Sequence, residues 1–484
     1  MANVGSNVPT VERPTVFVLL GASGDLAKRM ILPGIYHLFR AGLLPENFAL
    51  IGSAPAEQNF DTPSFRSHMR DAVATFGRRE LDEKLWARLS PSVSFASFDQ
   101  SDPAPLLDAV NAAKRQWPSP AQVLFYLAIP PPAFPGVVQL MGKTGLADGA
   151  KLIIEKPFGH DLESALALNA ALGSVFAEDQ IYRIDHFLGK EAVQNILAVR
   201  FANGIFEPAW NHRHLDYIQI DIPEELTVSD RGAFYEATGA LRDMIVTHLF
   251  QLLGFLAMEM PADFGPASLN EARLAVFEAM RPVTKQDCVF GQYGGYRGEP
   301  GVAPESQVET LAALRVHIDN DRWQGVPFFL RTGKAMAATS STVTLGFKTP
   351  AHQLFPPPSG APANLDPNEL VLELTDPGSI RLDFTAKEPG PTMTLGLASM
   401  GFDYQSSFNS TADLKAYERL LHDVMLGDHT LFNGAQGIER LWEVVAPVLA
   451  DPPAVQPYDS GSWGPDALDT LVAPWRWNLG ERLR

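Results

Sequence analysis

The sequence of 484 residues contains a single cysteine and no long uninterrupted apolar run. Cys288 has no partner within the chain, so an intramolecular disulfide scaffold is excluded. A membrane span needs roughly 18 consecutive apolar residues, whereas polar residues interrupt the longest candidate, 244–258. The first fourteen residues, MANVGSNVPTVERP, contain neither the apolar segment nor the basic leader of a signal peptide. We therefore expect a cytoplasmic protein that has no membrane partner.

Basic residues are also scarce relative to acidic ones. The chain has 38 Lys and Arg against 56 Asp and Glu, which gives a net charge of −18. This charge argues against a nucleic-acid partner, because phosphate backbones attract cationic surfaces. Hydrophobic residues make up 46% of the chain and charged residues 19%, which excludes a disordered protein. At roughly 150 residues per domain, the length favours two domains.

The first third of the chain alternates short apolar runs with helix-like stretches. Residues 1–14 are polar and form a predicted flexible tail. Strands buried on both faces are expected where the sequence is continuously apolar, at 16–20, 48–51, 124–128 and 152–154. The alternation predicts an α/β Rossmann-type dinucleotide-binding domain over residues 15–185.

In the rest of the chain, most of the predicted strands follow other strands in sequence. Expected strands are 217–222, 311–318, 327–331, 343–347, 370–374 and 380–384, and expected helices are 190–201, 239–256 and 411–425. The Pro- and Gly-rich segments 350–367 and 451–465 are expected to be loops. This order predicts a larger α+β domain with a mainly antiparallel sheet over residues 186–484.

A glycine turn, GASGDLAKR, links the first strand to the first helix. Gly21 permits a tight turn, and Gly24 lets a pyrophosphate approach the helix N-terminus, next to Ser23 and Asp25. An ordinary glycine turn is the alternative, but the flanking strand and helix favour nucleotide binding. An arginine after the second strand would favour NADP over NAD, and none is present between Ser53 and Glu57.

Three further segments contain clustered polar residues. In EKPFGHD, Lys156 follows a parallel strand, where open α/β sheets bind ligands, although a surface ion pair at a strand end is the alternative. In RIDHFLGKE, His186 and Lys190 share a helix face if the helix has begun, and they would clamp a phosphate. Asp185 there could simply cap the helix.

The third segment, LRDMIVTHLFQLLGFL, contains Asp243 and His248 in an otherwise apolar helix. A buried histidine is most often a core residue. With an aspartate such as Asp185 fixing its tautomer, however, it would act as a base. Lys334, in RTGK, adds a further positive charge after an apolar strand.

With these segments, the chain resembles the glucose-6-phosphate dehydrogenase family from about Thr15 to the carboxyl terminus. The resemblance is found in GASGDLAKR, YLAIPP, EKPFG, RIDHFLGKE, RGAFYEATGALRDMIVTH, RTGK, YERLLHD and YDSGSWGP. It implies oxidation of glucose 6-phosphate at C1 to 6-phosphogluconolactone with NADP, the first step of the oxidative pentose phosphate pathway. It also implies a homodimer or homotetramer assembled through the sheet of the second domain.

The resemblance assigns roles to individual residues. His248 would be the general base and Asp185 its partner. His186 and Lys190 would bind the phosphate, Glu224, Asp243 and Lys334 the sugar, and Lys156 both sugar and cofactor. The other expected cofactor-binding residues are Gly21, Ser23, Gly24, Asp25, Leu26 and Pro130. No metal is expected.

The sequence departs from the family pattern at five positions. Pro55 stands where the arginine for the 2′-phosphate is usual, so NAD or dual use stays open, although Lys28 and Arg29 would partly compensate. The other departures are Phe187 for Tyr, Thr339 for a basic residue, Thr247 for Asn and Met30 for Lys. Two alternatives remain: a different nicotinamide-dependent sugar oxidoreductase, such as the glucose-fructose oxidoreductase and inositol dehydrogenase group, and a non-catalytic sugar-phosphate-binding paralogue.

Overall fold

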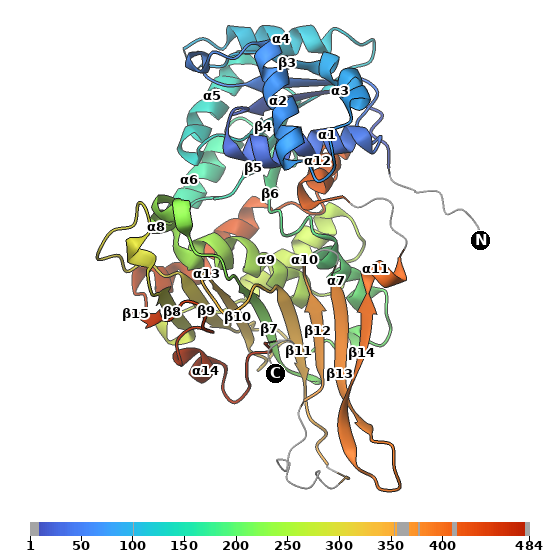
Figure 1. Cartoon of the computed structure of the whole chain (residues 1–484), viewed down its shortest axis with the longest axis vertical. Helices are drawn as coiled ribbons and strands as arrows, with labels where there is room; N and C mark the ends of the chain where they lie inside the picture. Colours follow the sequence, from blue (N-terminus) through green and yellow to red (C-terminus); the bar gives the residue numbers. More distant parts are fainter. Residues whose placement is uncertain are drawn as a thin grey trace, which may run out of the picture.

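Two β-sheets, one above the other in Figure 1, organise the chain. A computed structural model describes residues 9–99, 101–352, 354–355, 367–375, 378–408 and 414–479. The upper sheet is built from the first part of the sequence and the lower sheet from the rest, with helices between them. The tail prediction and most of the predicted loop 350–367 lie outside the described residues.

The upper sheet has six strands in the order β3-β2-β1-β4-β5-β6, and every pair is parallel. This doubly wound order places the glycine turn at the point where the strand order reverses. All six residues of the first strand are buried, as its continuous apolar sequence predicts. The Rossmann-type prediction is therefore confirmed. The strands are β1 (Thr15–Leu20), β2 (Phe48–Ser53), β3 (Val93–Phe95), β4 (Gln122–Leu127), β5 (Lys151–Glu155) and β6 (Ile181–Ile184).

Helices from both ends of the sequence cover the upper sheet. Those from the first part of the chain are α1 (Leu32–Arg40), α2 (Thr62–Phe76), α3 (Glu83–Leu89), α4 (Ala104–Lys114), α5 (Phe134–Thr144) and α6 (Leu162–Gly173), and a π-helical turn, Ala27–Ile31, precedes α1. A later helix, α12 (Ala416–Leu426), lies beside α1 (Figure 1). Its Glu418 pairs with Arg78 at 2.8 Å, and Lys151 Nζ donates to the carbonyl of Val424 at 2.6 Å. The chain thus returns to its first sheet near its end.

The lower sheet has nine strands in the order β14-β13-β12-β11-β7-β10-β9-β8-β15. Only the pairs β7–β10 and β8–β15 are parallel, so the prediction of a mainly antiparallel sheet is confirmed. The strands are β7 (Leu215–Pro223), β8 (Cys288–Tyr293), β9 (Leu311–Val316), β10 (Phe328–Gly333), β11 (Thr342–Phe347), β12 (Glu369–Glu373), β13 (Ser379–Lys387), β14 (Leu395–Asp403) and β15 (Val455–Tyr458).

The expectation that 451–465 is entirely loop is wrong, because Val455–Tyr458 forms β15. The strand pairs with β8 at the end of the sheet. An edge position tolerates Pro457, since a proline there need not donate to a second neighbour. Proline content alone therefore misassigned this segment.

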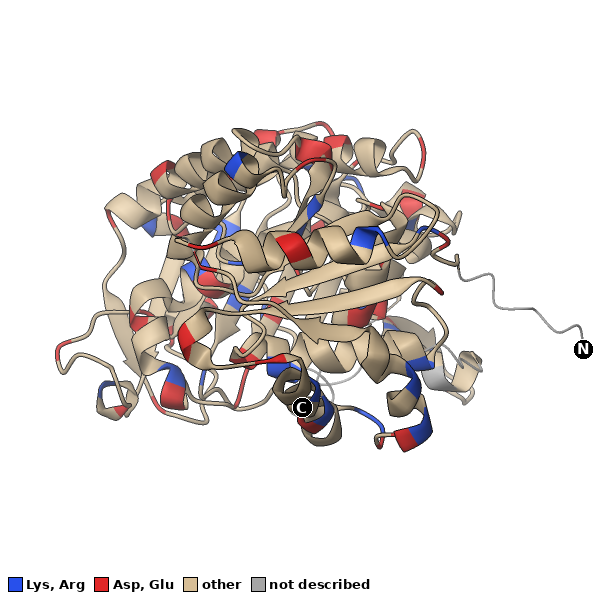
Figure 2. Ribbon diagram, turned by 90° about the horizontal axis from the view of Figure 1, so that it is seen from above, with Lys and Arg blue, Asp and Glu red and all other residues tan. Residues whose placement is uncertain are grey.

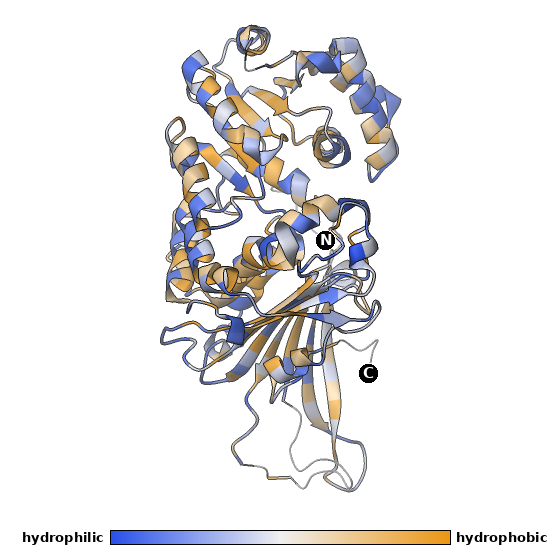
Figure 3. Cartoon of the chain, turned by 90° about the vertical axis from the view of Figure 1, so that its left-hand side faces the viewer, coloured by the Kyte–Doolittle hydropathy of each residue, from blue (hydrophilic) through white to orange (hydrophobic). Residues whose placement is uncertain are grey.

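Helices fill the space between the two sheets. They are α7 (Glu191–Phe201), α8 (Gly232–Ala240), α9 (Phe250–Ala257), α10 (Pro266–Ala279) and α13 (Ala435–Ala450), with the short α11 (Tyr404–Ser407) and α14 (Ala467–Val472) at the margins. In Figure 3 the hydrophobic residues concentrate in the strands and on the inward sides of the helices. One helical run, 229–257, is long and apolar enough to span a membrane, but 89% of its most apolar window is buried inside the molecule, as in a core helix.

The predicted helix 239–256 has a different winding from the expected one. Gly239 has φ 64° and ψ 172°, which interrupts the helix at its start. A π-helix, η8 (Leu241–Leu249), follows and leads into α9. An apolar pattern fits either winding, so the sequence did not distinguish them. The predicted helix 190–201 is confirmed as α7, and 411–425 as α12 within the described residues.

Candidate active site

A cavity of about 570 Å³ opens at the carboxyl ends of β1, β2 and β4. Gly21 has φ +82°, and a Cβ there would lie 2.2 Å from the carbonyl oxygen of Ala128, so only glycine fits the turn. The cavity is lined by Leu20, Gly21, Ser23, Gly24, Ser53, Ala54, Pro55, Gln58, Phe98, Asp99, Ala128, Ile129, Pro130, Ala133 and Val137. This is the position at which doubly wound sheets bind dinucleotides.

Four of the predicted cofactor residues line this cavity, namely Gly21, Ser23, Gly24 and Pro130. Asp25, Leu26 and Lys156 are not among its lining residues. The Asp25 side chain is exposed and pairs with Arg29 at 2.7 Å. Sequence reasoning missed Phe98 and Asp99, which follow the three-residue strand β3. A strand that short has too little periodicity to be predicted.

Within the described residues, no lysine, arginine or histidine lines the cavity. Pro55 precedes the 3-10 turn Ala56–Gln58 at the end of β2. Lys28 and Arg29, the proposed compensating cations, lie over the ring of Phe76 at 5.7 and 5.0 Å from its centroid. The 2′-phosphate of NADP would therefore meet no cation from the cavity wall.

The π-helix brings Asp243 and His248 to one partner. In an α-helix the neighbouring side chains are three or four residues apart, so residues five apart point in different directions. A π-helix bonds each residue to the fifth one before it, and here the N–H of Phe250 bonds to the carbonyl of Ile245. Lys156 Nζ consequently lies 3.0 Å from Asp243 Oδ1 and 2.7 Å from His248 Nε2.

His248 is held in one tautomer by two partners. An ammonium group has only N–H donors, so the Nε2 atom of His248 accepts from Lys156. The proton is therefore on Nδ1, which donates to Asp185 Oδ1 at 2.6 Å. That oxygen also accepts from the N–H of Phe187 at 2.9 Å. The sequence left the Asp185–His248 distance open, and the structure places the two side chains in contact.

Burial dominates the protonation of this pair. Both side chains are almost fully buried. Burial lowers the pKa of His248 well below its usual value, and the Lys156 ammonium lowers it further. Burial raises the pKa of Asp185 to about 6, while nearby cations and the Phe187 N–H partly oppose this rise. At neutral pH the imidazole is neutral and the carboxylate is ionised, which is the state a general base requires.

Asp243 is the counterion of Lys156. Burial alone would raise the pKa of Asp243, but the Lys156 ammonium at 3.0 Å lowers it below its usual value. The Lys156–Pro157 peptide bond is cis. Lys156, which was predicted to contact both ligands, contacts the sugar-binding candidate Asp243.

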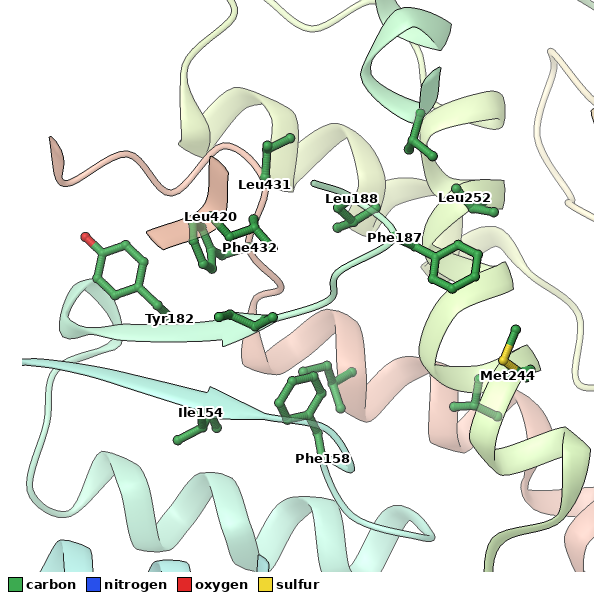
Figure 4. Packing of buried hydrophobic residues seen from close by; sticks show 14 of the residues in the cluster. Ile154, Phe158, Tyr182, Phe187, Leu188, Met244, Leu252, Leu420, Leu431 and Phe432 are labelled. Carbon is green, nitrogen blue, oxygen red and sulfur yellow. The ribbon is translucent and has the colours of Figure 1, made fainter. Parts of the chain in front are cut away.

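Phe187 is a site residue that the sequence reasoning treated only as a missing hydroxyl. Its ring stacks on His248 with centroids 4.5 Å apart and an interplanar angle of 25°. Lys190 Nζ lies 4.0 Å from the centroid of the same ring. In Figure 4 the ring lies against the helix that carries Met244 and Leu252. The Phe187 ring therefore connects the base with the predicted phosphate-binding lysine.

His186 and Lys190 are brought together by a turn rather than by a helix face. Residues 186–189 form a turn, and α7 begins only at Glu191. The His186 ring lies 4.9 Å from that of His248 and 6.0 Å from that of Tyr417. Burial, with help from nearby cations, lowers the pKa of His186 to about 3. The helix has not begun at His186, so the shared helix face does not apply, and the phosphate clamp stays a prediction.

Lys334 and Glu224 form the second ion pair of the site. Lys334 Nζ lies 2.7 Å from Glu224 Oε2, at the carboxyl ends of the parallel strands β7 and β10. The N–H of Glu224 donates to Gly333, and that of Met336 donates to Glu224. This backbone exchange holds the two charged residues side by side.

The other departures from the family pattern have modest local roles. Thr339 is exposed, and its hydroxyl accepts from the N–H of Glu225 at 2.9 Å. Thr247 donates to the carbonyl of Asp243 at 2.5 Å, one turn back in the helix. Met30 is 41% exposed.

Asp185, His186 and His248 are also close enough to hold a metal ion, with ligand atoms within 4.8 Å of one another. The bonds described above already use two of those three groups.

Two family profiles match the chain. Residues 18–195 match the profile described as "Glucose-6-phosphate dehydrogenase, NAD binding domain", and residues 197–478 match "Glucose-6-phosphate dehydrogenase, C-terminal domain". The "Glucose-6-phosphate 1-dehydrogenase" of Chlamydia muridarum is 36% identical over 496 residues, which cover 97% of each chain. That of Mycolicibacterium smegmatis is 38% identical over 489 residues, which cover 96% of this chain and 97% of the relative.

Solved structures match at similar coverage. The crystal structure of "Glucose-6-phosphate 1-dehydrogenase from Mycobacterium avium" is 35% identical with a TM-score of 0.85, and the match covers 96% of this chain and 99% of that one. A structure titled "Glucose-6-phosphate dehydrogenase in complex with its substrate glucose-6-phosphate" is 29% identical with a TM-score of 0.89. That match covers 97% of this chain and 100% of the other.

Proposed function

The chain belongs to the glucose-6-phosphate dehydrogenase family, and from that premise we propose how its own residues oxidise glucose 6-phosphate at C1 to 6-phosphogluconolactone. It is an oxidoreductase, and the cofactor of its family is NADP. The observation that carries the proposal is the contact of His248 with Asp185 on one side and Lys156 on the other.

The residues of the first domain fit a nicotinamide dinucleotide. The glycine turn leaves no room for a side chain at Gly21, and the cavity beside it extends over the ends of β1, β2 and β4. A nicotinamide dinucleotide bound there would supply the acceptor for the hydride released from C1 of the sugar. The chain itself supplies the glycine turn that would bind the dinucleotide and the cavity that would hold it.

His248 takes the proton of the C1 hydroxyl at Nε2. Lys156 Nζ donates to that atom in this structure, so the substrate hydroxyl replaces the ammonium group there. As Nε2 gains its proton, C1 becomes a carbonyl, and the imidazolium is stabilised by Asp185 through Nδ1. The displaced Lys156 remains beside Asp243, within reach of the substrate oxygens.

The substrate lies between two charged clusters. His186 and Lys190 bind the phosphate, because a dianion is attracted to the ammonium group and raises the proton affinity of the imidazole. Glu224, Asp243 and Lys334 hydrogen-bond to the sugar hydroxyls. The Glu224–Lys334 pair, 2.7 Å apart, presents an acceptor beside a donor for this purpose.

The test is reduction of NADP and of NAD by the purified chain with glucose 6-phosphate, followed by absorbance of the reduced nicotinamide. Turnover with the phosphate ester, and at least 100-fold weaker turnover with glucose, is expected. Equal turnover with glucose would reject the phosphate clamp and favour a different sugar oxidoreductase. Thermal stabilisation by glucose 6-phosphate without any reduction would favour a non-catalytic paralogue.

A second proposal concerns the cofactor of this particular chain. The described cavity wall has no cation beside Pro55, and Lys28 and Arg29 lie at Phe76. Binding of NADP then gains little from its extra phosphate, because no charge-assisted hydrogen bond forms there. The chain therefore uses NAD as well as NADP.

A third proposal concerns assembly and location. The strands β13 and β14 form a long hairpin that extends past the rest of the lower sheet (Figure 1). Met393, Leu397 and Met400 on or beside it are more than half exposed, which fits a surface buried between copies of the chain. We propose a homodimer or homotetramer in the cytoplasm. In the view from above, Lys and Arg are interspersed with Asp and Glu along the ribbon (Figure 2).

A further inference from the structure

Glu309 binds the start of the helix that carries the proposed base. It lies two residues before β9 and is 8% exposed. Its backbone carbonyl accepts from the N–H of Ala240 at 3.0 Å, and its Oε1 atom accepts from the N–H of Leu241 at 3.0 Å. These N–H groups belong to the first residues of the helix, where no earlier carbonyl is available. Glu309 therefore caps this helix from 68 residues away in sequence.

The helix depends on this cap because no residue of its own supplies one. The residue before η8, Ala240, has no side chain that can accept a hydrogen bond. Gly239 breaks the preceding helix at φ 64°, and a Cβ at that position would lie 2.3 Å from Glu309 Oε1. Any side chain at position 239 would therefore clash with the Glu309 carboxylate.

The next residue, Thr310, holds the other half of the sugar site. Its carbonyl accepts from the N–H of Lys334 at 2.9 Å. Tyr458 donates to the carbonyl of Lys334 at 2.6 Å, and its oxygen lies 3.1 Å from the hydroxyl of Thr310. Two consecutive residues therefore hold two parts of the site. Glu309 holds the helix that carries Asp243 and His248. Thr310 holds the loop that carries Lys334.

We propose that Glu309 is a positioning residue for hydride transfer, acting through its hydrogen bond to the N-terminus of η8. It sets the placement of Asp243 and His248 relative to Lys334, so that the base meets the C1 hydroxyl while the sugar is held at the loop. The inference rests on the proposed function. The acceptor atom, rather than the charge, supplies the cap.

The acceptor and the charge can be separated by substitution. Burial raises the pKa of Glu309, so the protein tolerates its neutral form better than it would at the surface. Glu309→Gln keeps an oxygen where Oε1 lies, and its activity is expected to stay within about threefold of the parent. Glu309→Ala leaves the Leu241 N–H without its partner, and a tenfold or greater loss of kcat/KM is expected, of the order produced by one lost buried hydrogen bond.

A primary isotope effect distinguishes positioning from loss of fold. With glucose 6-phosphate deuterated at C1, the isotope effect on kcat is expected to rise in Glu309→Ala, because slower hydride transfer becomes more rate-limiting. Fewer folded molecules would lower kcat and leave the isotope effect unchanged. Leu89→Ala, in the buried face of α3 far from the site, is the control for a general loss of stability. It should lower Tm without changing KM or the isotope effect.

Three results would overturn the inference: an unchanged kcat/KM in Glu309→Ala, an unchanged isotope effect despite a lower kcat, or equal losses in the Gln and Ala variants. The parent chain is assayed alongside. If it fails to reduce either nicotinamide, the proposed function fails. Binding of glucose 6-phosphate, measured by calorimetry, then still tests the positioning of Asp243, and an unchanged Kd in Glu309→Ala would reject it.

Discussion

At the scale of single residues, the site works by holding ionisable groups in the states that catalysis needs. Lys156 has two roles in this, because it orients the lone pair of His248 and offsets the charge of Asp243. In the proposed mechanism, its displacement by substrate removes a cation from the base, which makes the imidazole more basic as the reaction begins. Phe187 and Asp185 then limit the movement of the ring.

His248→Asn should reduce kcat by roughly 10²–10⁴, the usual contribution of a general base. The KM for glucose 6-phosphate should change little, since the phosphate and sugar contacts remain. Steady-state kinetics at saturating cofactor measure both values. Proportional loss of affinity and turnover would assign His248 a structural role instead.

Activity should fall on the acid side of about pH 6. Below the raised pKa of Asp185 the carboxyl is protonated, and it no longer stabilises the imidazolium that forms on His248. The profile of kcat/KM against pH measures this limb. Asp185→Asn, which cannot ionise, should be weakly active and should lack the limb. An acid limb that survives in this variant would belong to another group.

Pro55→Arg should lower the KM for NADP roughly tenfold, because a charge-assisted bond to the 2′-phosphate contributes about 1.5–3 kcal/mol. The KM for NAD should remain nearly constant. The ratio of kcat/KM for the two cofactors is the measurement, and Pro55→Gln is the uncharged control. The same ratio in all three proteins would show that Pro55 lies away from the 2′-phosphate.

At the scale of elements, the winding of η8 is the feature on which the site depends. The extra residue per turn lets Asp243 and His248 share Lys156, and Thr247 bonds back to Asp243 within the same turn. Such π-helical segments occur frequently at functional sites, since α winding is otherwise favoured. The apolar helix α9 beyond it stays in the core.

Deleting Leu249 places the N–H of Phe250 four residues after Ile245 and keeps Asp243 and His248 five residues apart, so the segment 241–248 should adopt α winding. Asp243 would then rotate away from Lys156, and turnover should fall by more than 10²-fold. Circular dichroism should retain the helix content, and NAD(P) binding to the first domain should persist in a fluorescence titration. Retained activity would show that the π winding is dispensable.

The features that consecutive residues form by themselves could be predicted from the sequence. The apolar run, glycine turn and helix at Gly21 are consecutive in sequence, and they were found as expected. The apolar helix alone favoured a core histidine at 248, so its role as a base was predicted only from the family resemblance, and its contact with Asp185 required the structure. The Glu309 cap was not readable, since it joins residues that only tertiary folding brings together. The π winding was missed because apolar spacing does not report backbone bonding.

At the scale of the whole molecule, the β13–β14 hairpin is the surface through which copies of the chain are expected to meet. Leu397 is 59% exposed. Leu397→Asp should therefore lower the mass measured by light scattering, because burying a carboxylate in an interface is costly. Leu166→Asp, on the 46% exposed Leu166 of α6, is the matched control. An unchanged mass in the Leu397 variant would place the interface elsewhere.

The return of α12 to α1 determines when this protein can finish folding. As the ribosome releases the chain, all six strands of the upper sheet emerge long before Ala416. Until α12 is synthesised, no helix covers Arg78, Lys151 or the face of α1 that α12 contacts. The first domain to be synthesised is thus among the last to be completed. A truncated product that ends before α12 would expose this apolar face to chaperones and proteases rather than persist as a free nucleotide-binding module.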